Sequence, residues 1–334
     1  MSDKIAILGA GSWGITLGKL LAEKGHKVSL WEPDKKLARI LDSQRSFKFL
    51  PGLKIPADIL ISQEADKVLS GANIIILAVP SQFMGEVARN ITPLVKDKRV
   101  ITVIATKGIE SNTSLRMSEI LAQHFTPGLA ENITVLSGPT IAVEVMKKMP
   151  AAAVVACARE DIARYVQDSF ITPEFRLYTS TDVIGVELGG SVKNIIAIAA
   201  GISDGLGLGT NSKAALMTRG IVEIIRLGLV LGARAETFNG LSGIGDLITT
   251  CISKYSRNRT FGEKIGQGKT AEKALAEIEM VVEGVKTTEG VYNLAAKHNI
   301  QMPITTEIYN ILFKGKDPKK AVGDLMMRQA KPED

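Results

Sequence analysis

The chain has 334 residues, 45% of them hydrophobic, and a formal net charge of +6. This length exceeds one typical domain, so we expect two domains that share a cleft. Lysines and arginines are scattered among acids, and only 5% of residues are aromatic, so no nucleic-acid partner is expected and the positive charge favours a small anionic ligand.

The first predicted element is an apolar strand, Lys4 to Leu8, that runs into the glycine turn Gly9-Ala10-Gly11-Ser12-Trp13-Gly14. In such a turn the first glycine makes a tight bend, the second lets backbone approach a pyrophosphate, and the third lets the next helix pack on the strand. The pattern predicts that helix from Ile15 to Ala22 and a second strand from Lys27 to Glu32. In this context the turn indicates a dinucleotide site, with pyrophosphate on the free N–H groups of the helix.

Strands and helices then alternate. A helix is predicted from Asp34 to Gln44, followed by a Pro/Gly loop at 49–53 and an apolar strand within 73–80 that is typical of a parallel sheet buried on both faces. Further strands are predicted at 99–105, 133–137, 151–158 and 175–179, with helices at 81–95, 112–125, 140–149 and 160–170. The alternation predicts an α/β fold with a doubly wound sheet and right-handed crossovers.

From Asp182 the strand pattern disappears. Helices are predicted at 182–204, 211–231, 237–251, 256–267, 270–278, 287–298, 304–314 and 317–329. We therefore expect a Rossmann-type dinucleotide-binding domain over residues 1–181 and an all-helical domain for substrate binding and catalysis over residues 182–334.

Cysteines and histidines argue against a disulfide framework and against zinc. Cys157 and Cys251 are far apart in sequence, which fits a reducing compartment and two buried small hydrophobes. His26, His124 and His298 have no zinc-ligand spacing with them. No run of eighteen uncharged apolar residues and no leader pattern is present, so we expect a cytoplasmic protein with no membrane partner and no metal.

Glu32 lies eighteen positions after Gly14, at the end of the second predicted strand. An acid there accepts hydrogen bonds from the ribose hydroxyls of NAD and repels the 2′-phosphate of NADP. A solvated acid at a strand end is the alternative. Lys35, Lys36 and Arg39 follow and could bind a 2′-phosphate, so the choice between NAD and NADP stays open.

Two loops that follow predicted strands hold candidate ligand-binding groups. Lys107 lies in Ala105-Thr106-Lys107-Gly108, at the sheet edge where open α/β sheets bind ligands. The segment Ser137-Gly138-Pro139-Thr140 follows another strand and opens a helix, so its N–H groups can approach nicotinamide or substrate. A solvated loop lysine is the alternative for Lys107.

Lys193 lies in the segment 183–200, which is otherwise nearly uncharged and is expected to run through the interior. Burial lowers the pKa of a lysine toward the range useful for proton transfer. Gly189 and Gly190, one turn earlier, are expected to leave room above it on the same helix face. The alternative is a lysine that snorkels to the surface.

Three later features are candidate parts of the site. Asp246 could orient Lys193 or bind a substrate hydroxyl, although an aspartate after glycine is also a common N-cap. The segment 255–260 begins a short helix with Arg, Asn and Ser, which suits a phosphate or carboxylate, or is a solvated basic turn. Glu283 is expected in a loop with no evident charge partner, and its role is left open.

Long motifs are spread along the whole chain: GAGSWG at 9–14, LPG at 50–52, AVPS at 78–81, TKG at 106–108, SGPT at 137–140, GVELGGSVKN at 185–194, GIGDLITTC at 243–251, SRNR at 256–259 and VEG at 282–284. Together they resemble the NAD(P)-dependent glycerol-3-phosphate dehydrogenase family in its soluble bacterial form. The resemblance implies a Rossmann domain followed by an all-helical domain like that of 6-phosphogluconate dehydrogenase, and usually a homodimer.

The resemblance also implies the reaction, which interconverts dihydroxyacetone phosphate and sn-glycerol 3-phosphate with NAD or NADP and supplies phospholipid synthesis. Lys193 is then the general acid/base, and Asp246 and Lys107 complete the catalytic set. The implied substrate-binding residues are Lys107, Gly138, Thr140, Lys193, Asn194, Asp246, Thr250, Ser256, Arg257 and Asn258. Besides Gly9, Gly11, Gly14 and Glu32, the implied cofactor contacts are Ser12, Trp13, Lys107, Ala142, Arg257, Val281 and Glu283.

Two positions depart from the usual pattern of that family. Thr140 stands where serine is common, and Trp31-Glu32-Pro33-Asp34 lacks the basic residue often found after this tryptophan, which favours NAD. One alternative function is a β-hydroxyacid or ketopantoate-type reductase on a similar scaffold, whose substrate would present a carboxylate. Another is a dinucleotide-binding sensor without catalysis, which turnover of the cofactor would exclude.

Overall fold

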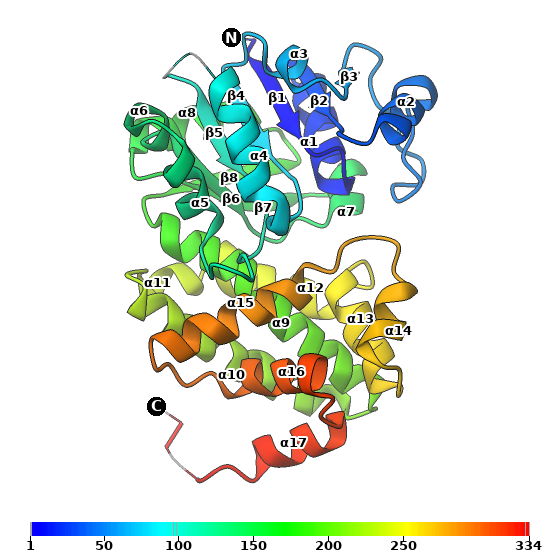
Figure 1. Ribbon diagram of the computed structural model, residues 1–334, viewed down its shortest axis with the longest axis vertical. Helices are drawn as coiled ribbons and strands as arrows, with labels where there is room; N and C mark the ends of the chain where they lie inside the picture. The colour runs from blue at the N-terminus through cyan, green and yellow to red at the C-terminus, as the bar shows by residue number, and fades with distance from the viewer. Residues whose placement is uncertain (1, 96, 98, 331, 334) are drawn as a thin grey trace.

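The computed structural model describes residues 2–95, 97, 99–330 and 332–333, so Met1 and Asp334, the ends of the two predicted domains, lie outside the described residues. Figure 1 shows the strands gathered in the N-terminal half and a group of helices around α9 in the C-terminal half. The chain passes between them once, from Ser180 at the end of the last strand to Val183 at the start of α9.

Eight strands form one sheet in the order β3-β2-β1-β4-β5-β6-β7-β8. Their bounds are β1 Lys4–Leu8, β2 Lys27–Trp31, β3 Leu60–Ser62, β4 Ile74–Leu77, β5 Ile101–Ile104, β6 Ile133–Ser137, β7 Ala151–Ala156 and β8 Phe175–Ser180. Side chains alternate across the sheet: Ile5 and Ile7 of β1 join the hydrophobic cluster on one face, and Ala6 and Leu8 join the cluster on the other. The doubly wound α/β prediction is confirmed.

Two details of the sheet differ from the prediction. Strands β6 and β7 pair antiparallel, with Val135 opposite Ala156, whereas a parallel sheet was expected. The connection between them contains only the short helix α7 (Ala142–Met146), which does not carry the chain back across the sheet. Strand β3 was not predicted, because three residues at the sheet edge give too little periodic signal.

Helices cover both faces of the sheet. They are α1 Ser12–Glu23, α2 Lys35–Gln44, α3 Ala65–Leu69, α4 Met84–Ile91, α5 Met117–His124, α6 Pro127–Ala130, α7 and α8 Glu160–Phe170. The helix expected at 81–95 is split into two short 3-10 turns around α4. The helices expected at 112–125 and 140–149 are shorter than predicted, and α3 and α6 were missed because four or five residues do not complete an amphipathic repeat.

The second half is all-helical, as predicted. Its helices are α9 Val183–Gly205, α10 Gly209–Val230, α11 Ala235–Phe238, α12 Asp246–Ile252, α13 Arg257–Gly266, α14 Ala271–Ala276, α15 Glu283–Lys297, α16 Pro303–Lys314 and α17 Pro318–Met326. The single helix expected at 237–251 is interrupted by a π-helical turn, Leu241–Gly245, where glycines at 243 and 245 weaken regular helix.

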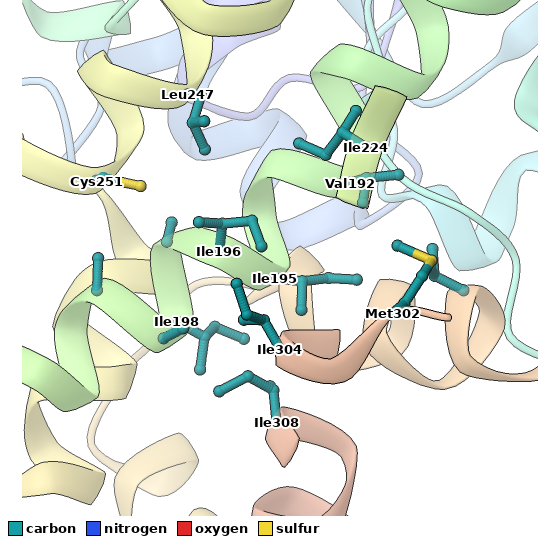
Figure 2. Close-up of a cluster of buried hydrophobic side chains, with 14 of the residues drawn as sticks. Val192, Ile195, Ile196, Ile198, Ile224, Leu247, Cys251, Met302, Ile304 and Ile308 are labelled. Atoms are coloured by element: carbon teal, nitrogen blue, oxygen red, sulfur yellow. The ribbon is translucent and has the colours of Figure 1, made fainter. Parts of the chain in front are cut away.

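Helix α9 is the core of this half. In Figure 2 its side chains Val192, Ile195, Ile196 and Ile198 lie among residues of other helices, and all four are fully buried. Among the described residues, α9 is also the one helix long and apolar enough to cross a membrane by length and composition, but 89% of that window is buried inside the molecule. Its apolar character therefore serves the packing of the surrounding helices.

Candidate active site

The glycine turn has the shape that a pyrophosphate requires. Gly9 has a φ of +108°, and a Cβ there would lie 2.7 Å from the carbonyl oxygen of Ala78. A Cβ at Gly11 would meet no atom within 4 Å, so the backbone faces open space at this point. No side chain caps the start of α1, which leaves its first N–H groups free for an anion. These residues fit a dinucleotide.

The other predicted cofactor contacts of this region surround the same turn. Ser12 Oγ lies 3.8 Å from the sulfur of Met280, which belongs to the loop before α15. The turn therefore faces the helical half of the chain. Trp13 packs on the ring of Phe175 at 6.5 Å between centroids, and the carbonyl oxygen of Ala142 accepts a hydrogen bond from Thr16 of α1 at 3.5 Å.

Lys193 is buried, with 5% of its surface exposed, so the snorkelling alternative is wrong. Its Nζ donates to Asp246 Oδ1 at 2.5 Å and to Thr250 Oγ1 at 2.6 Å. Thr250 in turn donates to the backbone carbonyl of Asp246 at 2.7 Å, so its lone pair is left for Lys193. An ammonium has three N–H donors, and among the described residues only these two acceptors bond to it; one donor remains for a substrate oxygen.

Lys107 shares the carboxylate of Asp246. Its Nζ donates to Asp246 Oδ2 at 2.8 Å and to the carbonyl oxygen of Gly138 at 2.9 Å. Ser137 Oγ lies 3.5 Å from the same carboxylate oxygen. Loops at the ends of β5 and β6 thus meet α9 and α12 around one buried aspartate, which is 1% exposed.

Burial and charge set the protonation of Lys193. Desolvation lowers the pKa of its ammonium to about 8, against the attraction of Asp246, and the nearby positive charge of Lys107 lowers it further. A lysine with this pKa changes protonation near neutral pH, as a general acid/base must.

Two asparagines form a relay beside this centre. Gly284 N donates to Asn258 Oδ1 and Asn258 Nδ2 donates to Asn194 Oδ1, each at 2.9 Å. Asn194 Nδ2 reaches the carbonyl oxygen of Lys107 at 3.4 Å. The relay connects the start of α15 with α13, α9 and the Lys107 loop, so both predicted substrate residues also hold elements together.

The start of α13 and the start of α15 meet at the cleft. Arg257 is exposed and donates to the carbonyl oxygen of Val281 at 2.6 Å. Glu283 is the first residue of α15 and accepts from Ser81 N at 3.2 Å and from Ser81 Oγ at 2.5 Å. Burial raises the pKa of its carboxyl group, while the Ser81 donors and Arg257 oppose the shift. The expectation that Glu283 lies in a loop without a partner is wrong.

Two local expectations are also corrected. Gly189 and Gly190 do not leave an empty space: a Cβ at Gly189 would collide with the backbone of Ser242, and one at Gly190 with the side chain of Ser137. These glycines let α9 approach the π-helical turn and β6. Asp246 is not an N-cap; Gly245 holds that position, and the carboxylate of Asp246 bonds the two lysines.

Two predicted substrate residues have local hydrogen bonds. Ser256 is the N-cap of α13 and accepts from Arg259 N at 3.2 Å. Thr140 donates to the carbonyl oxygen of Gly138 at 3.2 Å. Each hydroxyl therefore has a structural partner. Thr140 would have to give up its bond to Gly138 in order to donate to a substrate oxygen, whereas Ser256 accepts in its bond and can still donate.

The sequence reasoning missed Glu187. This residue of α9 is 3% exposed and accepts from Ser118 N at 2.8 Å, Ser118 Oγ at 2.6 Å and Arg116 at 2.8 Å, at the start of α5. The signal was available, because Glu187 is the other charged residue in the apolar segment that singled out Lys193. Its carboxylate therefore connects α9 to the start of α5, one of the helices that cover the sheet.

No group of three His, Cys, Asp or Glu side chains within the described ranges is arranged to hold a metal ion. Cys157 and Cys251 are both fully buried and unpaired, as predicted. Desolvation raises the pKa of the Cys251 thiol to about 12, so it stays protonated beside Lys193. The chemistry that this cluster offers is proton transfer by lysine.

The chain is similar to proteins of one family along its whole length. The family models described as NAD-dependent glycerol-3-phosphate dehydrogenase N-terminus and C-terminus match residues 4–163 and 182–323. A Geobacter sp. (strain M21) protein named glycerol-3-phosphate dehydrogenase (NAD(P)+) is 47% identical over 334 residues, covering 100% of this chain and 99% of that protein. The glycerol-3-phosphate dehydrogenase structure from Coxiella burnetii is 39% identical and covers 98% of this chain and 99% of that chain, with a TM-score of 0.93. A ketopantoate reductase structure from Ralstonia eutropha JMP134, 15% identical over 95% of this chain and 99% of that chain, has a TM-score of 0.60 and shares the fold alone.

Proposed function

The chain belongs to the NAD-dependent glycerol-3-phosphate dehydrogenase family, and on that basis we propose the role of each residue in its site. It is an NAD(P)-dependent oxidoreductase that interconverts dihydroxyacetone phosphate and sn-glycerol 3-phosphate. The observation that carries the proposed roles is the buried ammonium of Lys193, held by Asp246 and Thr250 at the sheet edge that bears the glycine turn.

Lys193 is the general acid/base. When bound, a nicotinamide would supply hydride to C2 of dihydroxyacetone phosphate in reduction and would accept it in oxidation. Lys193 Nζ donates a proton to the carbonyl oxygen as that oxygen becomes an alkoxide, and removes it again in the reverse direction. The third N–H of the ammonium, which has no described acceptor, is the donor for this bond.

Asp246 and Lys107 set the position and charge of that ammonium. Asp246 holds Lys193 through Oδ1 and Lys107 through Oδ2, so one carboxylate keeps two positive groups beside the oxygen that gains negative charge. Lys107 also binds the substrate, and Thr250 prevents rotation of the Lys193 side chain. Positive charge fixed before the reaction stabilises the alkoxide without reorganisation.

The start of α13 binds the substrate phosphate. Arg257 supplies a charged fork and Asn258 the neighbouring amide, in keeping with the preference of phosphate for arginine at a helix start. Gly138, Thr140, Asn194 and Ser256 line the remainder of the substrate site. Binding energy from the phosphate, which does not react, then orients the carbonyl toward Lys193.

A dinucleotide would be held along the glycine turn. Gly9, Gly11 and Gly14 shape the turn, and the remaining cofactor contacts are Ser12, Trp13, Glu32, Lys107, Ala142, Arg257, Val281 and Glu283. Support comes from the open space beside Gly11 and from the approach of Ser12 to Met280, which brings the turn and the α15 loop together.

The alternatives raised by the sequence are not favoured. A ketopantoate-type reductase shares the fold at 15% identity, whereas the family match extends over both halves of the chain. A sensor without catalysis would have no use for a buried lysine whose pKa is lowered to about 8.

The domain division and the cellular setting complete the proposal. Residues 1–181 bind the dinucleotide and residues 182–334 carry the catalytic lysine, because the sheet ends at Ser180 and α9 begins at Val183. The enzyme acts in the cytoplasm as a homodimer, without a nucleic-acid or membrane partner. Two buried, unpaired cysteines suit a reducing compartment. Light scattering during size-exclusion chromatography measures the oligomeric state.

Replacement of Lys193 tests the proposed role. Lys193→Ala is expected to lower turnover of dihydroxyacetone phosphate by roughly 10²-fold to 10⁴-fold, the usual contribution of general acid catalysis. Binding of NADH, measured by fluorescence, is expected to persist and shows that the variant is folded. Lys264→Ala is the matched control. Lys264 lies on α13 and forms an ion pair with Glu277. Full turnover in Lys193→Ala would overturn the role.

A further inference from the structure

Glu32 lies against the glycine turn, where the adenosine end of a dinucleotide must pass. Its Oε1 accepts from Asp34 N at 3.0 Å, and the backbone of Ala10, inside the turn, opposes the rise that burial causes in the pKa of this carboxyl group. The turn is tied to the end of β2 by a hydrogen bond from Gly9 N to the carbonyl oxygen of Trp31 at 3.1 Å. The carboxylate is therefore fixed relative to the pyrophosphate site.

The neighbouring helix start is already occupied by a second acid. Asp34 is the N-cap of α2, and its Oδ1 accepts from Leu37 N at 2.7 Å. The N–H groups that could hold a 2′-phosphate at this corner therefore face a carboxylate instead. An anion on the ribose would meet two negative groups, Glu32 and Asp34.

Basic residues near this corner do not offset the acids. Lys35, Lys36 and Arg39 are exposed, and no hydrogen bond or ion pair among the described residues holds any of them in place. An exposed and unrestrained cation gains little from pairing, because solvent screens it and its side chain loses entropy. A 2′-phosphate thus has no fixed positive partner to compensate for the carboxylates.

We propose that Glu32 makes this enzyme selective for NAD(H) over NADP(H). The carboxylate accepts hydrogen bonds from the ribose hydroxyls and repels the 2′-phosphate. The inference rests on the proposed function and goes beyond it, because the name of the Geobacter relative covers both dinucleotides. Burial disfavours the ionised carboxylate of Glu32 and so raises its pKa. Hydrogen bonds from ribose hydroxyls would stabilise the ionised form, whereas a nearby phosphate would destabilise it by charge repulsion.

Equilibrium binding to the full chain, without any substrate, tests this selectivity. ADP-ribose and 2′-phospho-ADP-ribose are titrated by calorimetry, and NADH and NADPH by fluorescence. ADP-ribose and NADH are each expected to bind about tenfold or more tightly than their phosphorylated counterparts, which corresponds to a modest charge repulsion at this range. Added salt is expected to narrow the ratio, because it screens charge. Equal binding, or tighter binding of the phosphorylated ligands, would overturn the inference.

A variant identifies the residue responsible. Glu32→Gln removes the charge and keeps an oxygen for the N–H of Asp34. It is therefore expected to tighten NADPH binding severalfold and to weaken NADH binding, because a neutral amide oxygen makes weaker hydrogen bonds with the ribose hydroxyls than a carboxylate does. Asp42→Asn, which removes an acid at the far end of α2, is expected to keep the wild-type ratio. An unchanged ratio in folded Glu32→Gln contradicts the assignment. If that variant does not fold, the wild-type titrations still decide the selectivity.

The binding test is separate from the reaction. Selective binding by a protein that does not reduce dihydroxyacetone phosphate would leave this inference standing and defeat the proposed function. Turnover of that substrate with unselective binding would do the reverse.

Discussion

Lys193 and Asp246 are 53 positions apart in sequence, yet their charged groups lie 2.5 Å apart in the interior. The pair is not isolated, because Lys107 binds the second oxygen of the same carboxylate at 2.8 Å. Two lysines and one aspartate leave the cluster with an excess of positive charge. That excess suits a reaction in which a carbonyl oxygen becomes negative.

The pH dependence of the reaction is expected to follow Lys193. Its ammonium, with a pKa of about 8, must be protonated to reduce the ketone, so kcat/KM for dihydroxyacetone phosphate is expected to fall as pH rises through about 8. Oxidation of glycerol 3-phosphate needs the neutral amine, so its kcat/KM is expected to rise over the same range. Profiles of kcat/KM in both directions report the free enzyme. Parallel profiles in the two directions would contradict this assignment.

Neighbouring charges are expected to move that titration in opposite directions. Asp246 raises the pKa of Lys193 and Lys107 lowers it. Asp246→Asn is therefore expected to shift the inflection of the profile to lower pH, and Lys107→Met to higher pH, with both variants less active. The residual activity of each is measured against pH at saturating NADH. An unshifted inflection in both variants would show that burial alone sets the pKa of Lys193.

Arg257→Ala is expected to weaken recognition of phosphate. A hydrogen bond to a charged group is worth about 2 kcal/mol, or roughly a thirtyfold increase in KM for dihydroxyacetone phosphate. At saturating NADH, which offsets any loss of the cofactor contact of Arg257, activity on unphosphorylated dihydroxyacetone is expected to change little, so the preference between the two substrates falls. Arg164→Ala, at an exposed arginine of α8, is the control. An unchanged preference in Arg257→Ala would place the phosphate elsewhere.

Glu187→Ala is expected to destabilise the fold. The change leaves Arg116 and the N–H of Ser118 without their buried acceptor, and breaking a buried ion pair costs about 3 kcal/mol or more. The thermal midpoint is measured by circular dichroism, beside Glu160→Ala, whose exposed pair with Arg164 is expected to contribute less than about 1 kcal/mol. Equal thermal midpoints for the two variants would show that the buried hydrogen bonds and ion pair of Glu187 do not stabilise the fold.

Local sequence determined the features that depend on neighbours along the chain. The strand and glycine turn at 4–14 and the apolar run around Lys193 follow from residues within a few positions of each other. Backbone conformation at Gly9 and burial of α9 are consequences of that local pattern. The sequence was therefore sufficient to predict the dinucleotide turn, the α/β and all-helical halves of the chain, and the burial of Lys193.

Tertiary structure alone decided which distant groups meet. The direction of β7, the contact of Gly189 with the backbone of Ser242, and the bond from Gly284 to Asn258 each join segments that no local periodicity relates. The same holds for the carboxylate that Lys193 shares with Lys107. Such contacts depend on how whole helices pack against the sheet, since a side chain finds its partner only after the elements that carry both have docked.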